Sequence, residues 1–130
     1  MTKNTLFIIL DRDGVINFES KDYIKTPEEW LPIAGSLEAI ALLTQAGYTI
    51  AVATNQAGVG RGFYTEAELA LIHQKMLDSV KAQGGKLDKV FYCPHLPEDH
   101  CSCRKPGIGL FEQIADYYQL DLRGIIAIGD

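Results

Sequence analysis

The amino-acid sequence predicts an α/β fold with a doubly wound, mostly parallel sheet of the Rossmann-like type, and three observations lead to it. Short apolar runs alternate with stretches whose apolar residues recur at helical spacing, which is typical of stacked βαβ units. Residues 6–10 are apolar throughout, as in a strand buried on both faces. Polar residues capable of chemistry follow the predicted strands, where open parallel sheets bind ligands.

Each element has its own signal in the sequence. Pro27 and Pro32 interrupt regular structure after the first strand, and Thr65 with Glu68 forms a capping box ahead of a helix. The expected elements, in order, are a strand at 6–10, a loop at 11–34, a helix from Ser36 that stops at Gly47, a strand at 49–53, a glycine-bearing loop at 56–62, a helix after Thr65 that ends at Gly84, a strand at 90–92, a loop at 93–106, a helix at 110–118 and a strand at 125–128.

Length and composition indicate a single globular domain over residues 1–130. The net charge of −5 disfavours binding to nucleic acid or to an anionic membrane, whereas a small anion could still be held by local basic groups. No apolar run approaches the roughly 20 residues of a membrane helix, and no secretory signal is visible. Because an odd number of cysteines makes no disulfide framework, we expect a cytoplasmic protein, and we expect it to be a monomer.

A pair of carboxylates, Asp11 and Asp13, is the sharpest chemical signal. Two acids this close destabilise each other unless a cation or a proton intervenes, and magnesium prefers carboxylate and phosphate oxygens. With the metal in place, one carboxylate could attack phosphorus and the other could protonate the leaving oxygen and later activate water. On spacing alone, an Asp-Gly turn with solvated acids explains the pair equally well.

The motifs of the whole chain resemble those of the haloacid-dehalogenase superfamily of phosphatases. Asp11-Arg12-Asp13-Gly14-Val15 is similar to the first motif, and Ala53-Thr54-Asn55-Gln56 is similar to the second. Lys105 matches the basic third motif, and Gly129-Asp130 matches the start of the acidic fourth motif. The resemblance implies the haloacid-dehalogenase type of sheet without a large cap domain.

The resemblance also assigns roles to these residues. It implies that Asp11 is the nucleophile, that Asp13 is the acid/base, and that Asp11, Asp13 and Asp130 bind Mg²⁺. The residues expected to bind phosphate or substrate are Thr54, Asn55, Gln56, Arg61, Arg104 and Lys105. For Arg61, which would hold a second phosphate, a solvent-facing side chain is an equally good interpretation.

A cluster of Cys93, His95, Cys101 and Cys103 predicts a small zinc loop. Three thiolates and one imidazole suit a tetrahedral, structural Zn²⁺ site, which leaves no ligand position for water. The loop would fix the approach of Arg104 and Lys105 to phosphate. A set of buried thiols beside an unrelated histidine is less favoured, because free cysteines rarely cluster in this way.

Within the superfamily, the segment 58–67 resembles the heptose bisphosphate phosphatases, enzymes of envelope-sugar (lipopolysaccharide) synthesis, whereas the short loop at 93–103 resembles the histidinol-phosphate phosphatases. A sugar bisphosphate is the expected substrate, with histidinol phosphate as the runner-up. The sequence is also compatible with a non-enzymatic phospho-acceptor or a zinc-stabilised binding module.

The sequence departs from the superfamily pattern in two places. Val15 replaces the usual threonine, and the sequence stops at Asp130, so we expect a longer natural protein.

Overall fold

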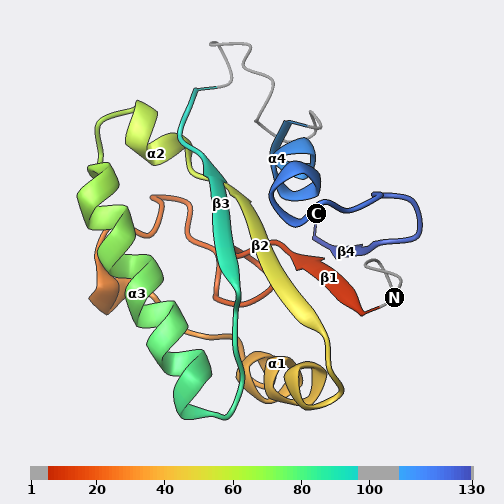
Figure 1. Cartoon of the computed structure of the whole chain (residues 1–130). Helices are drawn as coiled ribbons and strands as arrows, with labels where there is room; N and C mark the ends of the chain where they lie inside the picture. Colours follow the sequence, from red (N-terminus) through yellow and green to blue (C-terminus); the bar gives the residue numbers. More distant parts are fainter. Residues whose placement is uncertain (1–5, 97–108, 130) are drawn as a thin grey trace.

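The computed structural model describes residues 6–96 and 109–129, and it confirms the expected parallel α/β sheet. The strands are β1 (Phe7–Leu10), β2 (Thr49–Asn55), β3 (Lys89–Cys93) and β4 (Ile126–Ile128). They lie in the order β3-β2-β1-β4 and every neighbouring pair is parallel (Figure 1). The strand that precedes the two acids is therefore central, and ligands are expected beyond its carboxyl end.

Helices cover both faces of the sheet, as a doubly wound fold requires (Figure 1). On one face lie α1 (Ser36–Gln45), α3 (Glu66–Ala82) and a short 3₁₀ helix, η1 (Pro27–Glu29). On the other lies α4 (Gly109–Tyr118), which contacts β2 and β3. The described residues contain no helix that is long and apolar enough to cross a membrane.

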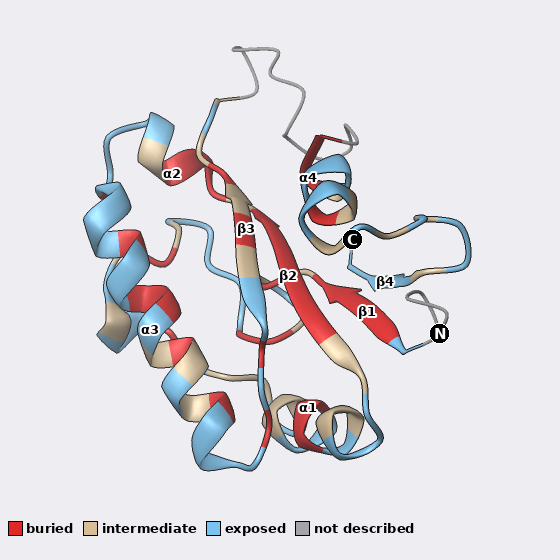
Figure 2. Cartoon of the chain, viewed as in Figure 1, coloured by how far each residue is buried: buried red, intermediate tan, exposed pale blue. Residues whose placement is uncertain are grey.

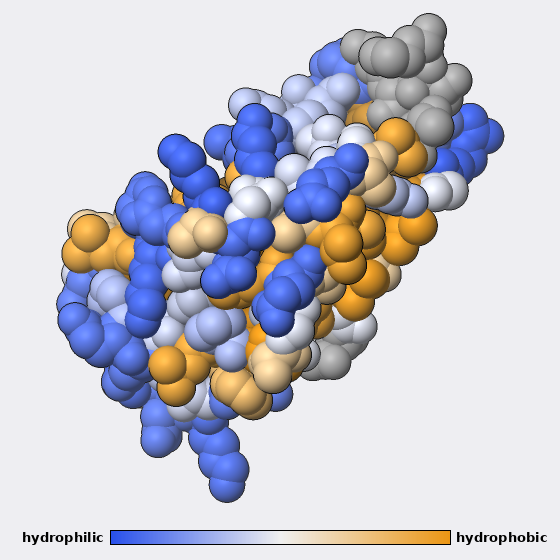
Figure 3. All heavy atoms as spheres, turned by 90° about the horizontal axis from the view of Figure 1, so that it is seen from below, coloured by the Kyte–Doolittle hydropathy of each residue, from blue (hydrophilic) through white to orange (hydrophobic). Residues whose placement is uncertain are grey.

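The central strand is buried on both faces, which confirms the prediction from its apolar run. Ile8 and Leu10 join the core under α1 and α3, whereas Phe7 and Ile9 join the core under α4. Figure 2 shows β1 and most of β2 as buried, whereas exposed residues lie on the outer faces of the helices, in the connecting loops and along the edge strand β4. On the face that Figure 3 shows, apolar side chains reach the surface among hydrophilic ones and also gather in one continuous area.

The sequence pattern of α3 explains its position. The predicted capping box is present, since Glu68 N–H donates to Thr65 Oγ1 at 3.0 Å and Thr65 N–H donates to Glu68 Oε1 at 2.7 Å. The apolar side chains expected on one face are all buried, namely those of Leu69, Ile72, Met76 and Val80. The helix is thereby anchored to the sheet along its whole length.

Truncating this face should destabilise the fold. Leu69 is fully buried on α3, whereas Leu71, two positions on, is 61% exposed. We expect Leu69→Ala to lower the free energy of unfolding by about 3 kcal/mol, because it removes apolar contacts and leaves a cavity. Leu71→Ala, the same substitution on the outer face, should change it by less than about 0.5 kcal/mol. Urea unfolding measures both, and equal losses would contradict the packing described.

The structure differs from the prediction in two segments that were expected to be loops. Residues 27–29 form η1, with Pro27 at its first position, where a missing N–H costs nothing. Ala57–Gly60 forms a short helix, α2, which begins two residues after β2 ends. Arg61 N–H donates to Ala57 O at 2.9 Å, so local hydrogen bonds override the loop-forming tendency of the glycines. Strand β2 also extends to Asn55, beyond the expected end at residue 53.

Candidate active site

Asp11 lies at the carboxyl end of β1, beside the end of β4. Its N–H donates to Ile128 O at 2.9 Å, which continues the pairing of the two strands by one residue. Its Oδ1 accepts from Arg12 N–H at 2.8 Å, so the backbone fixes the orientation of the carboxylate. A partly buried carboxylate held in this way is suited to attack an electrophile that enters from beyond the sheet.

The segment after β4 passes unusually close to this carboxylate. A Cβ atom built on Gly129 would lie 2.9 Å from Asp11 Cβ, a separation that real Cβ atoms essentially never show. Only glycine fits here without displacing Asp11. A cavity of about 140 Å³ opens at the same place, with Asp11, Phe111 and Gly129 among its lining residues. The nucleophile expected from the sequence thus faces a space beside the sheet edge.

The side chain of Asp13 is 28% exposed, and its carboxylate is held by three side chains. Its Oδ1 accepts from Arg12 Nη2 at 2.8 Å, Arg12 Nε at 3.1 Å and Asn17 Nδ2 at 3.0 Å. Its Oδ2 accepts from Gln56 Nε2 at 3.2 Å. Among the residues that the structure describes, Oδ1 has three donors and Oδ2 has only this long one, so Oδ2 is the oxygen better placed to exchange a proton with a ligand.

Arg12 is completely buried, and a histidine of α3 completes its environment. Arg12 Nη1 lies 3.1 Å from His73 Nε2. A guanidinium group can only donate, so His73 Nε2 must accept and the imidazole must be neutral. Burial, followed by the charge of Arg12, lowers the pKa of His73 to about 3, while the charge of Asp13 opposes the shift. The ring of Tyr92 lies 6.1 Å from the His73 ring, between centroids.

This buried histidine makes the stability of the protein depend on pH. The pKa of His73 is about 3 in the folded chain and ordinarily 6.5, so between these values the unfolded chain binds a proton that the folded chain does not. The contribution of neutral His73 to the free energy of unfolding is therefore complete above pH 6.5 and is lost as the pH falls towards 3. We expect wild type to lose about 1.4 kcal/mol more per pH unit than His73→Gln below about pH 6. Urea unfolding at several pH values measures this, and parallel curves would contradict it.

Gln56 and Tyr64 form a second buried contact to Asp13. Tyr64 Oη donates to Gln56 Oε1 at 2.7 Å, and burial raises the pKa of Tyr64 to about 12, so the hydroxyl keeps its proton. The other end of the Gln56 amide donates to Asp13 Oδ2 and, at 3.0 Å, to Thr54 Oγ1. Thr54, at the end of β2, is thereby tied to the same site as Asp13.

The structure therefore brings together three residues that the sequence indicated, Asp13, Thr54 and Gln56, and it places Asp11 at the end of β1, two residues before Asp13. Gln56 was expected to bind phosphate, yet its side chain is 2% exposed and donates to protein groups. Asn55 ends β2, half-buried and opposite Cys93. The other expected residues Arg104, Lys105, Asp130, Cys101 and Cys103 lie outside the described residues.

Arg61 is solvent-facing, as one of its two interpretations from the sequence has it. Its side chain is exposed, and its Nε donates to Tyr23 Oη at 3.0 Å. The Tyr23 ring lies 5.6 Å from the ring of Phe63, between centroids. Among the described residues, these contacts do not connect Arg61 to Asp11 or Asp13. Binding of a second phosphate by Arg61 therefore stays a prediction.

Sequence reasoning missed four residues that surround Asp13: Arg12, Asn17, Tyr64 and His73. Three of them had a signal that could have been used. Arg12 directly follows Asp11, and His73 lies on α3 beside the buried Ile72. Tyr64 comes directly before the capping box.

Val15, which stands where the superfamily usually has threonine, is partly buried against the core. Valine and threonine are similar in shape, so the packing of the turn after Asp13 is preserved. What the substitution removes is the hydroxyl group and any hydrogen bond that it would make.

The first part of the expected zinc loop is also described. Cys93 Sγ lies 3.5 Å from His95 Nδ1. Two ligands of a tetrahedral zinc ion at the usual bond lengths would lie about 3.6 Å apart, so this pair fits such an ion. However, Cys93 is disulfide-bonded in the structure, which is not the thiolate that zinc requires. Among the described residues, no group of three or more His, Cys, Asp or Glu is placed to hold a metal.

Comparison with known proteins identifies the family. The family model of the polynucleotide kinase 3 phosphatases matches residues 7–130. The D-glycero-beta-D-manno-heptose-1,7-bisphosphate 7-phosphatase of Pseudomonas aeruginosa is 54% identical over 123 residues, which cover 95% of this chain and 69% of that protein. The chain belongs to the haloacid-dehalogenase-like phosphatases. It spans 69–70% of the length of the Pseudomonas aeruginosa protein and of two further heptose bisphosphate phosphatases, from Pseudomonas putida and Bordetella bronchiseptica.

Solved structures of phosphatases in this family share the fold. The crystal structure of the D,D-heptose 1,7-bisphosphate phosphatase of Bordetella bronchiseptica, complexed with magnesium and phosphate, superposes with a TM-score of 0.94 at 49% identity. The match covers 97% of this chain and 70% of that one. A HAD-like phosphatase of Mesorhizobium loti gives a TM-score of 0.86 at 30% identity, covering 96% and 63%. The predicted fold class and the phosphatase assignment are thus confirmed.

Proposed function

We propose that this phosphatase removes the 7-phosphate of D-glycero-D-manno-heptose 1,7-bisphosphate and leaves the 1-phosphate. The observation that carries the proposal is the pair of carboxylates at the end of β1, Asp11 and Asp13, each oriented by hydrogen bonds. It is supported by relatives with that activity in their names, which are 50–54% identical over 95% of the chain.

The geometry supports a two-step reaction. In the first step a carboxylate oxygen of Asp11 forms a bond to phosphorus while the bond from phosphorus to the C7 oxygen breaks, and Asp13 gives its proton to that oxygen. In the second step Asp13 takes a proton from water, the water oxygen attacks phosphorus, and the Asp11 carboxylate is released with inorganic phosphate. Splitting the displacement in this way replaces one difficult step by two easier ones. Asp13 serves as acid and then as base.

The residues present fit a magnesium ion. The side chain of Asp11 and the backbone carbonyl of Asp13 are hard oxygen donors of the kind that Mg²⁺ prefers, and Asp130 follows Gly129 directly. These three residues would hold the ion, and Thr54 with Asn55 and Lys105 would hold the phosphoryl group. When bound, magnesium neutralises the charge that accumulates between the carboxylates and phosphate. The Bordetella relative was crystallised with magnesium and phosphate, which supports this assignment.

The proposed reaction is tested by following ³¹P NMR spectra of the bisphosphate with the purified chain and magnesium. We expect the 7-phosphate signal to be replaced by inorganic phosphate while the 1-phosphate signal persists, and we expect EDTA to stop the reaction until magnesium is restored. Histidinol phosphate serves as the comparison substrate. Loss of the 1-phosphate, or faster hydrolysis of histidinol phosphate, would overturn the substrate assignment.

The same experiment distinguishes the anomers. The relatives at 50–54% identity are named for the β-anomer, whereas a Campylobacter jejuni relative named for the α-anomer is 37% identical. We therefore expect kcat/KM to be higher for the β-bisphosphate. A preference for the α-anomer would show that sequence similarity does not follow anomer choice in this family.

We further propose that Cys93, His95, Cys101 and Cys103 bind one structural Zn²⁺ when the thiols are reduced. The support is the spacing of the Cys93 and His95 atoms, which suits neighbouring zinc ligands. Zinc and the disulfide exclude each other at Cys93, so a paired measurement decides between them. Elemental analysis should find stoichiometric zinc, and denatured protein with a chelator should then show every cysteine as a free thiol. Absence of zinc together with blocked thiols would refute the site.

A purely phospho-accepting or binding role is disfavoured by the arrangement around Asp13. A phospho-acceptor needs one acid to receive the phosphoryl group, whereas here a second carboxylate, that of Asp13, is held by hydrogen bonds beside the first.

The monomeric state and the cytoplasmic location stay predictions from the sequence. Sedimentation analysis would test the first, and fractionation of cells would test the second.

A further inference from the structure

We propose that His73 and Tyr64 are positioning residues that orient the Asp13 carboxylate from two sides, through Arg12 and Gln56 respectively, so that Oδ2 carries the transferred proton. The inference rests on the proposed acid/base role of Asp13. It adds two residues, distant in sequence from the motifs, that would control one step of the reaction. We call the four side chains Arg12, His73, Gln56 and Tyr64 the Asp13 clamp.

The first arm of the Asp13 clamp fixes Oδ1. Arg12 presents Nε and Nη2 to Oδ1, while its remaining nitrogen, Nη1, lies against His73 Nε2. A guanidinium group is planar, so an acceptor on the far nitrogen sets the plane in which the other two nitrogens donate. Without that acceptor, the fully buried Arg12 would have an unpaired N–H, and rotation towards another acceptor would withdraw the donors from Asp13.

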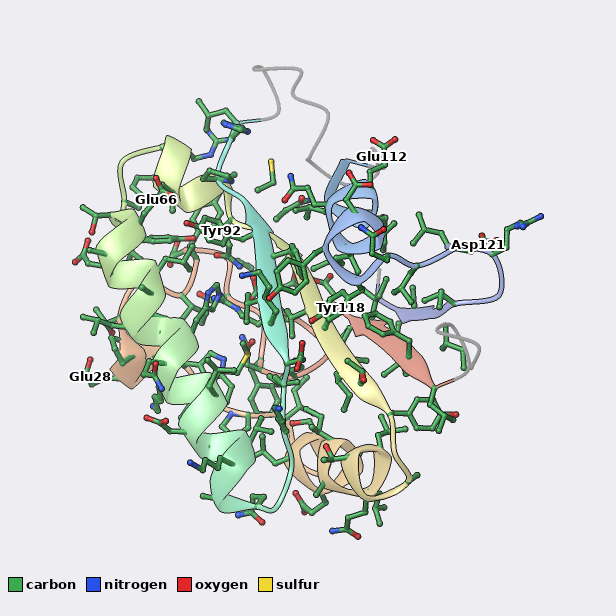
Figure 4. All side chains as sticks on the ribbon, viewed as in Figure 1. Glu28, Glu66, Tyr92, Glu112, Tyr118 and Asp121 are labelled. Carbon is green, nitrogen blue, oxygen red and sulfur yellow. The ribbon has the colours of Figure 1, made fainter. Side chains whose placement is uncertain are left out.

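His73 is itself held in place from the β3 side. The tilted contact with the Tyr92 ring covers it, and Tyr92 Oη donates to Glu66 Oε1 at 2.6 Å (Figure 4). Figure 4 shows Glu66 on α3 and Tyr92 on β3, so this hydrogen bond joins the helix that carries His73 to the edge of the sheet. The imidazole therefore offers its lone pair to Arg12 from a fixed position.

The second arm sets the orientation of the Gln56 amide. An amide can turn over and exchange its donor and acceptor ends at little steric cost. The Tyr64 hydroxyl donates to Oε1, which directs Nε2 towards Asp13 Oδ2 and Thr54 Oγ1. The Tyr64 ring packs directly on Gly58, where an added Cβ would overlap the ring atom Cε1, so the hydroxyl is held by close packing.

Because of these two sets of contacts, the two carboxylate oxygens of Asp13 have different roles. From the described part of the chain, Oδ1 receives three donors and is fixed, whereas Oδ2 receives only the Gln56 amide at 3.2 Å. A protonated Oδ2 still has a lone pair for that amide, so the clamp tolerates both protonation states. Loss of either arm should impair proton transfer to the leaving oxygen more than it impairs attack by Asp11.

Two substrates with different leaving groups test this. p-Nitrophenolate departs as a stable anion and needs little proton transfer, whereas a sugar alkoxide must be protonated as it leaves. In single turnovers with enzyme in excess, which measure departure of the leaving group and not the later hydrolysis of phosphorylated Asp11, we expect His73→Leu to lower the rate on the heptose bisphosphate by about 10- to 100-fold but on p-nitrophenyl phosphate by less than about 3-fold. Tyr64→Phe should show the same preference with a smaller loss. His73→Gln, which keeps an acceptor, should recover part of the activity.

Controls separate positioning from folding and from the proposed function. Gln74→Leu changes the adjacent exposed residue of α3 and should leave both rates unchanged. In an Asp13→Asn background, His73→Leu should cost no further activity, because the group that it positions is gone. Equal losses on the two substrates in His73→Leu, or additive losses in the double variant, would overturn the proposal while the wild-type activity still stands.

A crystal structure of His73→Leu gives a readout that does not depend on activity. We expect the Arg12 guanidinium to rotate and at least one of its hydrogen bonds to Asp13 to be lost. An Asp13 side chain in its original place with both Arg12 contacts intact would overturn the proposal, even if the wild-type protein hydrolysed neither substrate.

Discussion

Asp11→Asn is expected to abolish turnover, lowering kcat by at least about 10⁴-fold, a size typical for removal of a nucleophile. The amide has nearly the shape of the carboxylate, and Arg12 N–H can still donate to its oxygen, so the fold around β1 should persist. What is lost is an oxygen nucleophilic enough to attack phosphorus. Release of inorganic phosphate from the bisphosphate under saturating magnesium measures the effect.

A matched control separates this result from a general effect of charge. Asp116 is an exposed acid on α4, and Asp116→Asn removes the same charge away from the strand ends. Its rate should equal that of wild type within a factor of about two, as expected for surface substitutions. Native-rate hydrolysis by Asp11→Asn would mean that phosphorus is attacked directly by water, and the covalent mechanism would be abandoned.

Asp13→Asn should show the second-largest effect and a different pattern. On the sugar bisphosphate we expect a loss of about 10²- to 10⁴-fold, because general acid catalysis of leaving-group departure is removed. On p-nitrophenyl phosphate the first step should survive, while the second lacks its base. The phosphorylated Asp11 intermediate should therefore accumulate and appear as a stoichiometric burst of p-nitrophenol followed by slow turnover.

Intact-protein mass spectrometry of the quenched reaction checks for that intermediate. Asp78→Asn is the control, since Asp78 lies on α3 and accepts a hydrogen bond from the exposed Gln74, away from the strand ends. It should show neither a burst nor phosphorylated protein. If Asp13→Asn lost the burst as completely as Asp11→Asn does, Asp13 would act in attack on phosphorus and not in leaving-group protonation.

The parts of the fold that were predictable depend on local signals. The apolar run at 6–10, the Thr65 capping box and the spacing of Leu69 and Ile72 each specify an element without reference to distant residues. The positions of Asp11 and Thr54 were predictable for a related reason. Parallel strands end at a common edge, so residues that follow two strands in sequence become neighbours in space.

What the sequence could not supply were contacts between distant side chains. Arg12 and His73 are 61 residues apart, and nothing in either local sequence indicates that a buried guanidinium will meet an imidazole. The contacts of the Gln56 side chain were not evident from the sequence either. Its place two residues after Thr54 predicted a phosphate ligand, which stays a prediction, but nothing in the local sequence indicated that its side chain also links Tyr64 to Asp13. Such roles depend on tertiary packing, which no periodic pattern encodes.

The pairing of β1 with β4 has a consequence for how quickly the protein becomes active. The strand that precedes Asp11 pairs with β2 over a short separation, Phe7 with Thr49, but its pairing with β4, Ile8 with Ile126, requires a very long loop to close. Loop-closure entropy makes such pairing slow, and all-parallel sheets have few local contacts to hasten it. During refolding, recovery of hydrolysis should therefore lag behind recovery of helical circular dichroism.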